Sequence, residues 1–180
     1  RGLHFVPSFH RDLLRGVMTY WVEFFEAVQP DVAFVPIGQG SGFCAAAAAR
    51  AYTGVKTKLI GVVSAHATAY LDSFKAGRKL EAPVTTQLAD GMACRVPDEE
   101  SLAIVLREAD DVIAVTDTEV AQAMRMRFAC THNVAEGAGA ASRAAAAQQR
   151  EKLAGKVVGT TLCGGNVDSD VFARVLSGEI

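Results

Sequence analysis

Val35–Gly42, with the sequence VPIGQGSG, leads from an apolar run into a glycine-rich turn, and an alanine-rich stretch begins directly after it at Phe43. This order predicts a buried strand, a tight turn and a helix. Glycines at alternate positions allow positive φ, and the missing side chains let several N–H groups converge on an anion at a helix N-terminus. The stretch therefore predicts a phosphate-binding turn, although strand–turn–helix units also occur in α/β proteins for packing alone.

The rest of the hydrophobic pattern alternates between strands and helices. Near-continuous apolar runs predict buried parallel strands at 32–37, 59–63, 111–115 and 156–163. Helical spacing predicts helices at 43–52, 66–75, 99–107, 118–127, 134–150 and 168–176, and one from residue 10 until Pro30 ends it. This alternation predicts an α/β fold: a doubly wound, mostly parallel sheet flanked by helices, in a single segment over residues 1–180.

Composition limits the classes of function. Half of the 180 residues are hydrophobic, 21% are charged and the net charge is only -2, which argues against a nucleic-acid or polybasic membrane surface. The longest apolar stretches, 43–49 and 157–163, are far shorter than the roughly 18 residues of a membrane span. We therefore expect a soluble protein whose partners are small molecules, with no nucleic acid and no membrane.

The cysteines bear on the compartment. Cys44, Cys94, Cys130 and Cys163 are scattered without paired or zinc-binding spacing. Such spacing is typical of free thiols in a reducing environment rather than of a disulfide framework. We expect a cytoplasmic protein without a zinc site.

Ligands of a parallel α/β sheet bind beyond the carboxyl ends of its strands. Two glycine-rich turns follow predicted strands here, 38–42 and 163–166 (CGGN), and a third, 136–140 (EGAGA), opens the long alanine-rich helix. We expect all three to face one crevice.

Four motifs carry a resemblance when they are taken in chain order: 36–41 (PIGQGS), 89–91 (ADG), 135–140 (AEGAGA) and 162–166 (LCGGN). Together they resemble the C-terminal part of threonine/serine dehydratases, in the tryptophan synthase β-like, fold-type II family of pyridoxal-phosphate enzymes. The resemblance extends over essentially the whole chain from Gly2. It implies pyridoxal phosphate as the cofactor.

The resemblance assigns the glycine turn to the cofactor phosphate. Gly38, Gln39, Gly40 and Ser41 match the family's tetraglycine-type loop, with two of the glycines replaced, by Gln39 and Ser41. A backbone cradle tolerates these replacements if both residues keep ordinary φ.

Further positions match residues near the cofactor ring. Cys163 matches the family position, occupied by Ser or Cys, whose side chain meets the pyridine nitrogen of the cofactor. A neutral thiol cannot hold that nitrogen protonated. The resemblance therefore implies a cofactor that favours elimination over transamination. Gly91 and Glu136 match positions close to the same ring. The residues alone leave other interpretations open: a small buried hydrophobe for Cys163, a turn at Gly91 and a first-turn acid for Glu136.

The chain departs from the family in its lysine and metal positions. The family's Schiff-base lysine lies in a Ser-x-Lys-x-Arg-Gly segment before the phosphate loop, and no such segment precedes it here. We expect residues 1–180 to be the larger cofactor-binding part, with the N-terminal lysine-bearing part absent and no catalytic residue assigned. Lys75, in 73–78 (SFKAGR), follows the loop and is predicted to be a solvated helix-end cation. Ser64 stands where many relatives place a glutamate metal ligand, so no such metal site is expected.

For the complete enzyme the resemblance implies β-elimination: a lysine takes the α-proton of L-threonine or L-serine, the β-hydroxyl leaves, and hydrolysis releases a 2-oxo acid and ammonia. The alternatives are an ammonia-lyase or racemase for another hydroxy amino acid and a non-catalytic cofactor-binding fragment. A nucleotide-binding domain ranks last, because 54–69 offers no carboxylate for a ribose. Relatives are commonly dimers, so a homodimer is expected.

Overall fold

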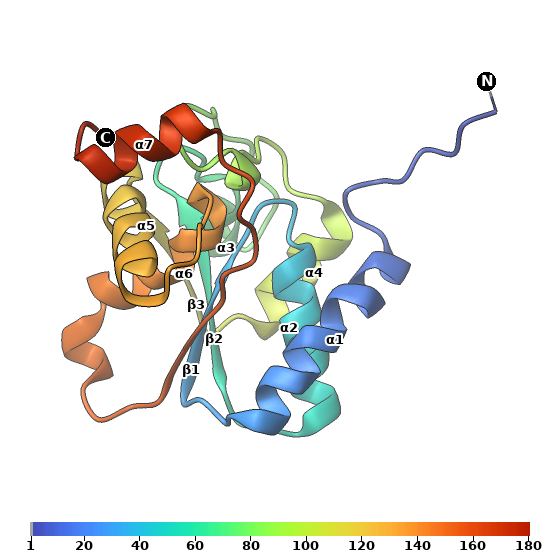
Figure 1. Cartoon of the computed structure of the whole chain (residues 1–180). Coiled ribbons are helices and arrows are strands. Elements are labelled where there is room, and N and C mark those ends of the chain that lie inside the picture. Colours follow the sequence, from blue (N-terminus) through green and yellow to red (C-terminus); the bar gives the residue numbers. More distant parts are fainter. Residues whose placement is uncertain (1) are drawn as a thin grey trace.

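The computed structural model describes residues 2–180, and its helices and strands alternate along the chain (Figure 1). The elements are α1 (Arg11–Ala27), β1 (Val32–Pro36), α2 (Ser41–Thr53), β2 (Lys58–Ser64), α3 (Ala69–Ala76), η1 (Asp90–Met92), α4 (Glu99–Glu108), β3 (Asp111–Val115), α5 (Asp117–Thr131), α6 (Gly137–Gln148), η2 (Arg150–Leu153), β4 (Val158–Thr160) and α7 (Ser169–Ser177). The elements η1 and η2 are short 3-10 helices.

The four strands are parallel and lie in the order β3-β2-β1-β4. From β1 the chain moves outward to β2 and β3, and then returns to the other side of β1 to form β4. The strand order therefore reverses between β1 and β4. In open α/β sheets such a reversal leaves a ligand-binding crevice at the carboxyl ends of the strands.

Helices cover both faces of the sheet (Figure 1). Ala33 and Val35 of β1 belong to a core that includes buried residues of α1, α2 and α4. Val32 and Phe34, which alternate with them along β1, face a second core formed with α5 and α6. The predicted doubly wound α/β fold is therefore confirmed.

The last strand is much shorter than predicted. Only Val158–Thr160 pair with β1, so the predicted strand 156–163 is wrong beyond Thr160. The carbonyl of Thr161 accepts hydrogen bonds from the side chains of Ser142 and Arg127, at 2.7 and 2.9 Å. The chain therefore turns away from the sheet before it reaches Cys163.

Two helices begin later than the hydrophobic pattern indicates. The helix predicted at 66–75 begins at Ala69, because His66 and Ala67 donate their N–H groups to Ser64 in a turn. The helix predicted at 134–150 begins at Gly137 and ends at Gln148. Ala67 and Ala135, just before the two helices, are buried without being helical, which periodicity alone does not distinguish.

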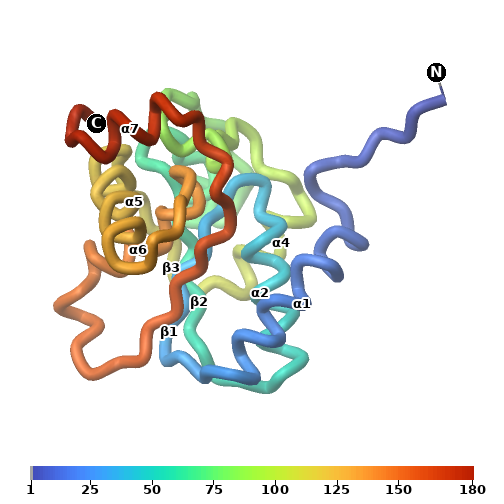
Figure 2. The backbone as a smooth tube through the Cα atoms, viewed as in Figure 1, coloured from blue at the N-terminus to red at the C-terminus, as the bar shows by residue number. Residues whose placement is uncertain are grey.

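Residues 2–6 project from the body as an exposed arm before α1 (Figure 2). Leu3 and Phe5 in this arm are 84% and 82% exposed. Within residues 2–180, no helix is long and apolar enough to cross a membrane.

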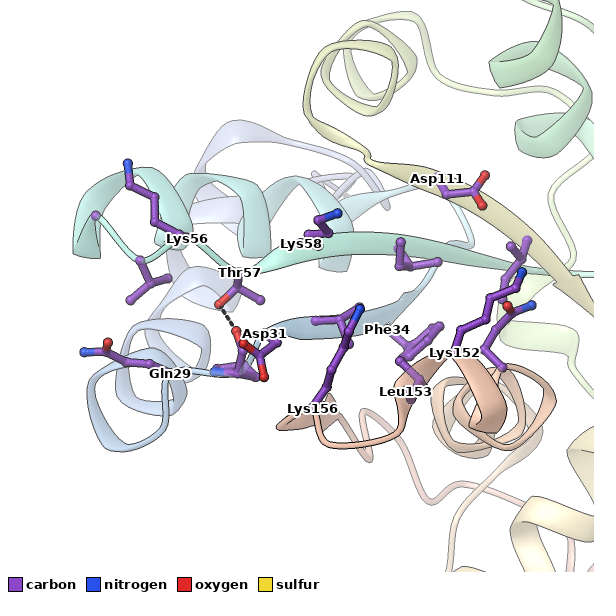
Figure 3. Close-up of a pocket in the computed structure, with 17 residues that line it drawn as sticks. Gln29, Asp31, Phe34, Lys56, Thr57, Lys58, Asp111, Lys152, Leu153 and Lys156 are labelled. Carbon is purple, nitrogen blue, oxygen red and sulfur yellow. Dashed lines mark hydrogen bonds between the residues drawn. The ribbon is translucent and has the colours of Figure 1, made fainter.

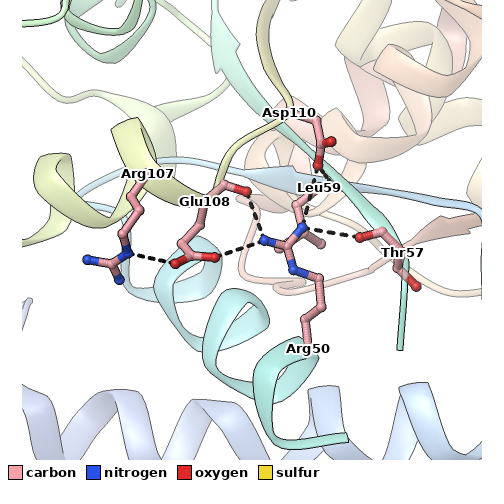
Figure 4. A network of polar contacts seen from close by, with 6 residues as sticks. All are labelled: Arg50, Thr57, Leu59, Arg107, Glu108 and Asp110. Carbon is pink, nitrogen blue, oxygen red and sulfur yellow. Dashed lines mark hydrogen bonds and ion pairs between the residues drawn. The ribbon is translucent and has the colours of Figure 1, made fainter. Parts of the chain in front are cut away.

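Arg50, near the end of α2, connects this helix by hydrogen bonds to the end of α4 and to the residues just before β2 and β3 (Figure 4). Its guanidinium donates to the carboxylate and the carbonyl of Glu108 at 2.9 and 3.0 Å, and to the carbonyl of Thr57 at 3.2 Å. Asp110 lies 3.4 Å from Arg50 and accepts the N–H of Leu59 at 2.9 Å. These contacts fix α2 against the end of α4 and the start of β2.

We expect Arg50→Met to lower the free energy of unfolding by about 2 kcal/mol, because it leaves part-buried carboxylates and carbonyls without their donor. Urea unfolding at pH 7 measures the change. Arg11→Met is the matched control: it removes the exposed pair with Glu100, and the expected loss is below about 0.5 kcal/mol. Equal losses in the two variants would contradict the role of Arg50.

The same network predicts a pH dependence. The hydrogen bond from Arg107, reinforced by that from Arg50, lowers the pKa of Glu108 from its ordinary value of 4.5. A lowered folded-state pKa gives stability that is complete above the unfolded pKa and is lost as pH falls through the folded pKa. We expect the stability difference between wild type and Arg50→Met to shrink as pH falls below 4.5. Urea unfolding at a series of acid pH values tests this, and a constant difference would disprove it.

Candidate active site

A cleft of about 310 Å³ lies at the carboxyl edge of the sheet, beyond β1. Every residue that the sequence assigned to cofactor binding lines this cleft, although they come from four separate parts of the chain. These residues are Gly38, Gln39, Gly40, Ser41, Gly91, Glu136 and Cys163. The three glycine-rich turns therefore do face one crevice, as expected.

The glycine turn lies directly against η1. A Cβ on Gly38 would overlap the carbonyl oxygen of Gly91, so the two backbones touch with no side chain between them. Among residues 38–42, only Gly40 has positive φ, at 96°, so the predicted positive φ at alternate glycines is wrong for the other two. Gln39 and Ser41 keep ordinary φ, and a backbone cradle tolerates them for that reason.

The turn presents free backbone donors to the cleft. Gly40 is the N-cap of α2 and caps it with no side chain, and the first helical hydrogen bond runs from the N–H of Cys44 to the carbonyl of Gly40. The N–H groups of Ser41, Gly42 and Phe43 come before that bond and lack partners within the helix. The positive end of the helix dipole adds to them, so the turn fits an anion such as a phosphate.

Side chains behind the turn hold it in place. The hydroxyl of Tyr70 donates to the carbonyl of Gln39 at 2.8 Å. A Cβ on Gly40 would overlap the hydroxyl oxygen of Ser101, which shows how closely α4 supports the turn. The donors are therefore pre-oriented.

Cys163 and Glu136 both line the cleft and belong to segments that are hydrogen-bonded to each other. The N–H of Glu136 donates to the carbonyl of Gly164 at 3.1 Å, and its carboxylate accepts the N–H of Asn166 at 3.0 Å. Burial and the nearby Glu136 carboxylate raise the pKa of the Cys163 thiol, even though part of this residue reaches the surface. The thiol is therefore protonated at neutral pH, and Glu136 has a structural partner in the same loop.

Sequence reasoning missed the contribution of α1. Val17 and Tyr20, one helical turn apart, line the cleft next to the glycine turn. Burial, followed by the neighbouring Cys163, raises the pKa of the Tyr20 hydroxyl, which stays protonated at neutral pH. Their spacing indicated only an apolar helix face, and no local pattern showed that this face turns toward a site formed by distant segments.

The structure keeps Lys75 and Ser64 out of the cleft. Lys75 is exposed in the last turn of α3, as predicted for a helix-end cation. Ser64 is fully buried, and its hydroxyl oxygen accepts the N–H of His66. Over residues 2–180, no cluster of three or more His, Cys, Asp or Glu side chains is arranged to hold a metal ion.

A larger cavity of about 590 Å³ opens at the other end of the strands (Figure 3). Phe34, Ile60 and Ile113 form an apolar wall on the sheet, and Lys58 and Lys156 stand at its edges. This cavity includes none of the predicted cofactor-binding residues. The predicted residues and the amides at the start of α2 gather instead at the smaller cleft.

The chain is a member of the family described as pyridoxal-phosphate dependent enzymes, since the family's model matches residues 1–164. Its members use pyridoxal phosphate as their cofactor.

Individual relatives are ammonia-lyases and racemases. The chain is 36% identical over 180 residues to an L-threonine ammonia-lyase of Geobacter sulfurreducens, covering 98% of this chain and 44% of that protein. It is 31% identical to an L-threo-3-hydroxyaspartate ammonia-lyase of Saccharomyces cerevisiae and 30% identical to a serine racemase of Schizosaccharomyces pombe, covering 99% and 98% of this chain and 55% of each relative. The chain thus spans about half the length of these relatives.

A solved structure shares the fold. The processed form of threonine deaminase isoform 2 from Solanum lycopersicum superimposes with a TM-score of 0.90 at 23% identity, over 98% of this chain and 52% of that one. The predicted tryptophan synthase β-like, fold-type II architecture is therefore confirmed.

We expect Gly38→Ala to lower the free energy of unfolding by roughly 1–3 kcal/mol, because the added Cβ pushes the turn away from Gly91. Gly42→Ala, within α2, is the matched control. The added Cβ would lie 3.8 Å from the carbonyl oxygen of Pro36, which is an ordinary van der Waals contact. That variant should gain about 0.5 kcal/mol from the lower backbone entropy of the unfolded chain. Urea unfolding of both variants tests the close approach, which a harmless Gly38→Ala would disprove.

Proposed function

We propose that the chain is the larger, cofactor-binding part of a pyridoxal-phosphate ammonia-lyase that converts L-threonine or L-serine into a 2-oxo acid and ammonia. The observation that carries the proposal is the cleft, which gathers the glycine turn, Gly91, Glu136 and Cys163 from four parts of the chain. The L-threonine ammonia-lyase among the relatives supports the substrate class.

The glycine turn is proposed to hold the cofactor phosphate. Gly38, Gln39, Gly40 and Ser41 surround the N-terminus of α2, whose amides are free. Hydrogen bonds from backbone N–H groups and the helix dipole both favour a phosphate there. The replacement of family glycines by Gln39 and Ser41 leaves the turn unstrained, because both residues keep ordinary φ.

Cys163 is proposed to face the ring nitrogen, with Gly91 and Glu136 close to the ring. When bound, pyridoxal phosphate supplies an electron sink for reactions at the α-carbon of an amino acid. The protonated Cys163 thiol offers that nitrogen a weak, neutral partner and does not hold it protonated, which favours elimination over transamination. Gly91 has no side chain, and a Cβ there would lie only 2.9 Å from the Cβ of Ala138, so the glycine lets η1 pack closely against α6 at the edge of the cleft.

The lysine that removes the α-proton is proposed to lie outside residues 1–180. Among the described residues that line the cleft, none is a lysine. The chain also spans about half of its relatives' length, which leaves a comparable length for such a part.

Assembly and compartment complete the proposal. The four cysteines are free thiols in the structure, which supports a reducing, cytoplasmic location. The exposed apolar side chains of Leu3 and Phe5 support an assembly larger than a monomer, and a homodimer is proposed. Sedimentation analysis tests the dimer.

A binding experiment tests the phosphate turn. We expect pyridoxal phosphate to bind the 180-residue chain at least about tenfold more tightly than pyridoxal, which has no phosphate. Ser41→Asp should weaken pyridoxal-phosphate binding by about tenfold or more, because its carboxylate competes for the same amides, while it leaves helix stability intact. Ser41→Ala is the control and should bind like wild type. Fluorescence titration gives all four affinities, and equal binding of pyridoxal phosphate and pyridoxal to the wild-type chain would contradict the turn's role.

Substrate assays on the full-length protein that carries this chain separate the alternatives. Formation of a 2-oxo acid from L-threonine or L-serine supports the proposed reaction. Release of D-serine from L-serine identifies a racemase, and activity confined to L-threo-3-hydroxyaspartate identifies another ammonia-lyase. Cofactor binding without turnover of any of these amino acids identifies a non-catalytic protein.

A further inference from the structure

The segment that carries Cys163 lies outside the sheet and is held at both ends. We call residues 161–166 the cysteine loop. Its far end is tied to the start of α6, because Glu136 exchanges hydrogen bonds with Gly164 and Asn166 at 3.1 and 3.0 Å. The thiol itself donates weakly to the carbonyl of Ala138, with 3.8 Å between the two atoms.

The near end of the cysteine loop is held at a single carbonyl, that of Thr161. Ser142 of α6 donates its hydroxyl to this oxygen at 2.7 Å, and Nη2 of Arg127 on α5 donates to it at 2.9 Å. The same nitrogen also lies 3.2 Å from the hydroxyl oxygen of Thr160, to which it donates. Two helices thus fix the backbone two residues before Cys163.

The charge of Arg127 is not used in an ion pair. None of the ion pairs between residues 2–180 includes Arg127, and its Nε is buried without a hydrogen-bond partner. Burial, and then the nearby Arg143, lowers the pKa of the guanidinium. A buried polar group without full pairing costs free energy, and an apolar side chain would fill this space without that cost. The side-chain hydrogen bonds of Arg127 go to Ser142 at 3.5 Å, to Thr160 at the end of β4 and to Thr161, the first residue of the cysteine loop.

We propose that Arg127 is a positioning residue that holds the cysteine loop so that Cys163 faces into the cleft. The part of this inference that concerns the pyridine nitrogen rests on the proposed function. The placement of the thiol rests only on the contacts of Thr160, Thr161 and Ser142.

The chain offers a closely matched control on the same helix. Arg125 also donates to backbone carbonyls, those of Val175 and Ile180, at 2.8 and 2.7 Å. These carbonyls belong to α7 and the residues after it, not to the cysteine loop. Arg125→Met therefore loses comparable hydrogen bonds without touching the loop.

The test measures how fast iodoacetamide alkylates Cys163, read by peptide mass spectrometry over a range of pH without any cofactor. In Arg127→Met we expect the alkylation rate of the exposed Cys163 to rise about fivefold or more and the midpoint pH of its rate profile to fall. The reason is that a released loop moves the thiol away from the Ala138 carbonyl and from the Glu136 carboxylate that raises its pKa. Loss of the arginine's charge alone acts in the opposite direction, since that charge lowers the pKa of the thiol. Arg127→Lys keeps a donor and a charge and should restore most of the wild-type rate.

Free cysteine added to each reaction is the internal standard, because its alkylation rate is the same whichever variant is present, whereas the exposed Cys130 lies one helical turn from Arg127 on α5. If Cys163 reacts in Arg127→Met as in wild type, or equally fast in Arg125→Met, the proposal is wrong. If Arg127→Met unfolds, the buried Cys44 and Cys94 also become reactive, and this reactivity reveals the unfolding. The comparison of Arg127→Lys with wild type then decides. A Cys163 that reacts several-fold faster in Arg127→Lys than in wild type contradicts the expectation that lysine restores the wild-type rate.

Titration with pyridoxal phosphate separates this inference from the proposed function. If Cys163 meets the pyridine ring of the cofactor, the released cysteine loop in Arg127→Met should weaken the binding of pyridoxal phosphate by about tenfold relative to Arg125→Met. Wild-type protein that binds no pyridoxal phosphate would overturn the proposed function and leave the alkylation result to decide the role of Arg127.

Discussion

The cleft depends on backbones that touch each other with no side chain between them. Gly38 lies against the carbonyl of Gly91, and Gly139 lies equally close to the carbonyl of Gly164. A Cβ at either glycine would overlap a backbone oxygen. Because of these contacts, η1, α6 and the cysteine loop can all approach the end of β1, and one small cleft collects groups from four parts of the chain. Larger residues would separate those parts and leave no common site.

The electrostatics of the cleft follow from the same construction. Among the described residues that line it, Glu136 is the one acidic side chain and none is a lysine or an arginine. The attraction for a phosphate therefore comes from the amides and the dipole of α2 rather than from lysine or arginine side chains. Glu136 is occupied with the backbone of the cysteine loop, and Cys163 stays a neutral thiol. Such a site holds its ligand by fixed, pre-oriented donors.

The strands and most helices were predictable because their patterns are local. Buried parallel strands appear as continuous apolar runs, and β1, β2 and β3 lie where those runs lie. The prediction of β4 was wrong beyond Thr160, because an apolar run does not show that Ser142 and Arg127 take the carbonyl of Thr161 away from the sheet. The start of α6 was missed for a similar reason, since the N–H of Glu136 bonds to Gly164 rather than continuing a helix.

By itself the sequence determined the fold class, the glycine turn after β1 and, through its resemblance to a family, which residues to seek at one site. Glycine positions and apolar spacing are written locally, so they can be read without coordinates. Only the tertiary structure decided that α1 brings Tyr20 to the cleft and that Arg127 anchors the cysteine loop. Those contacts join residues far apart in the chain, and their partners are set by how the layers pack, which no short pattern records.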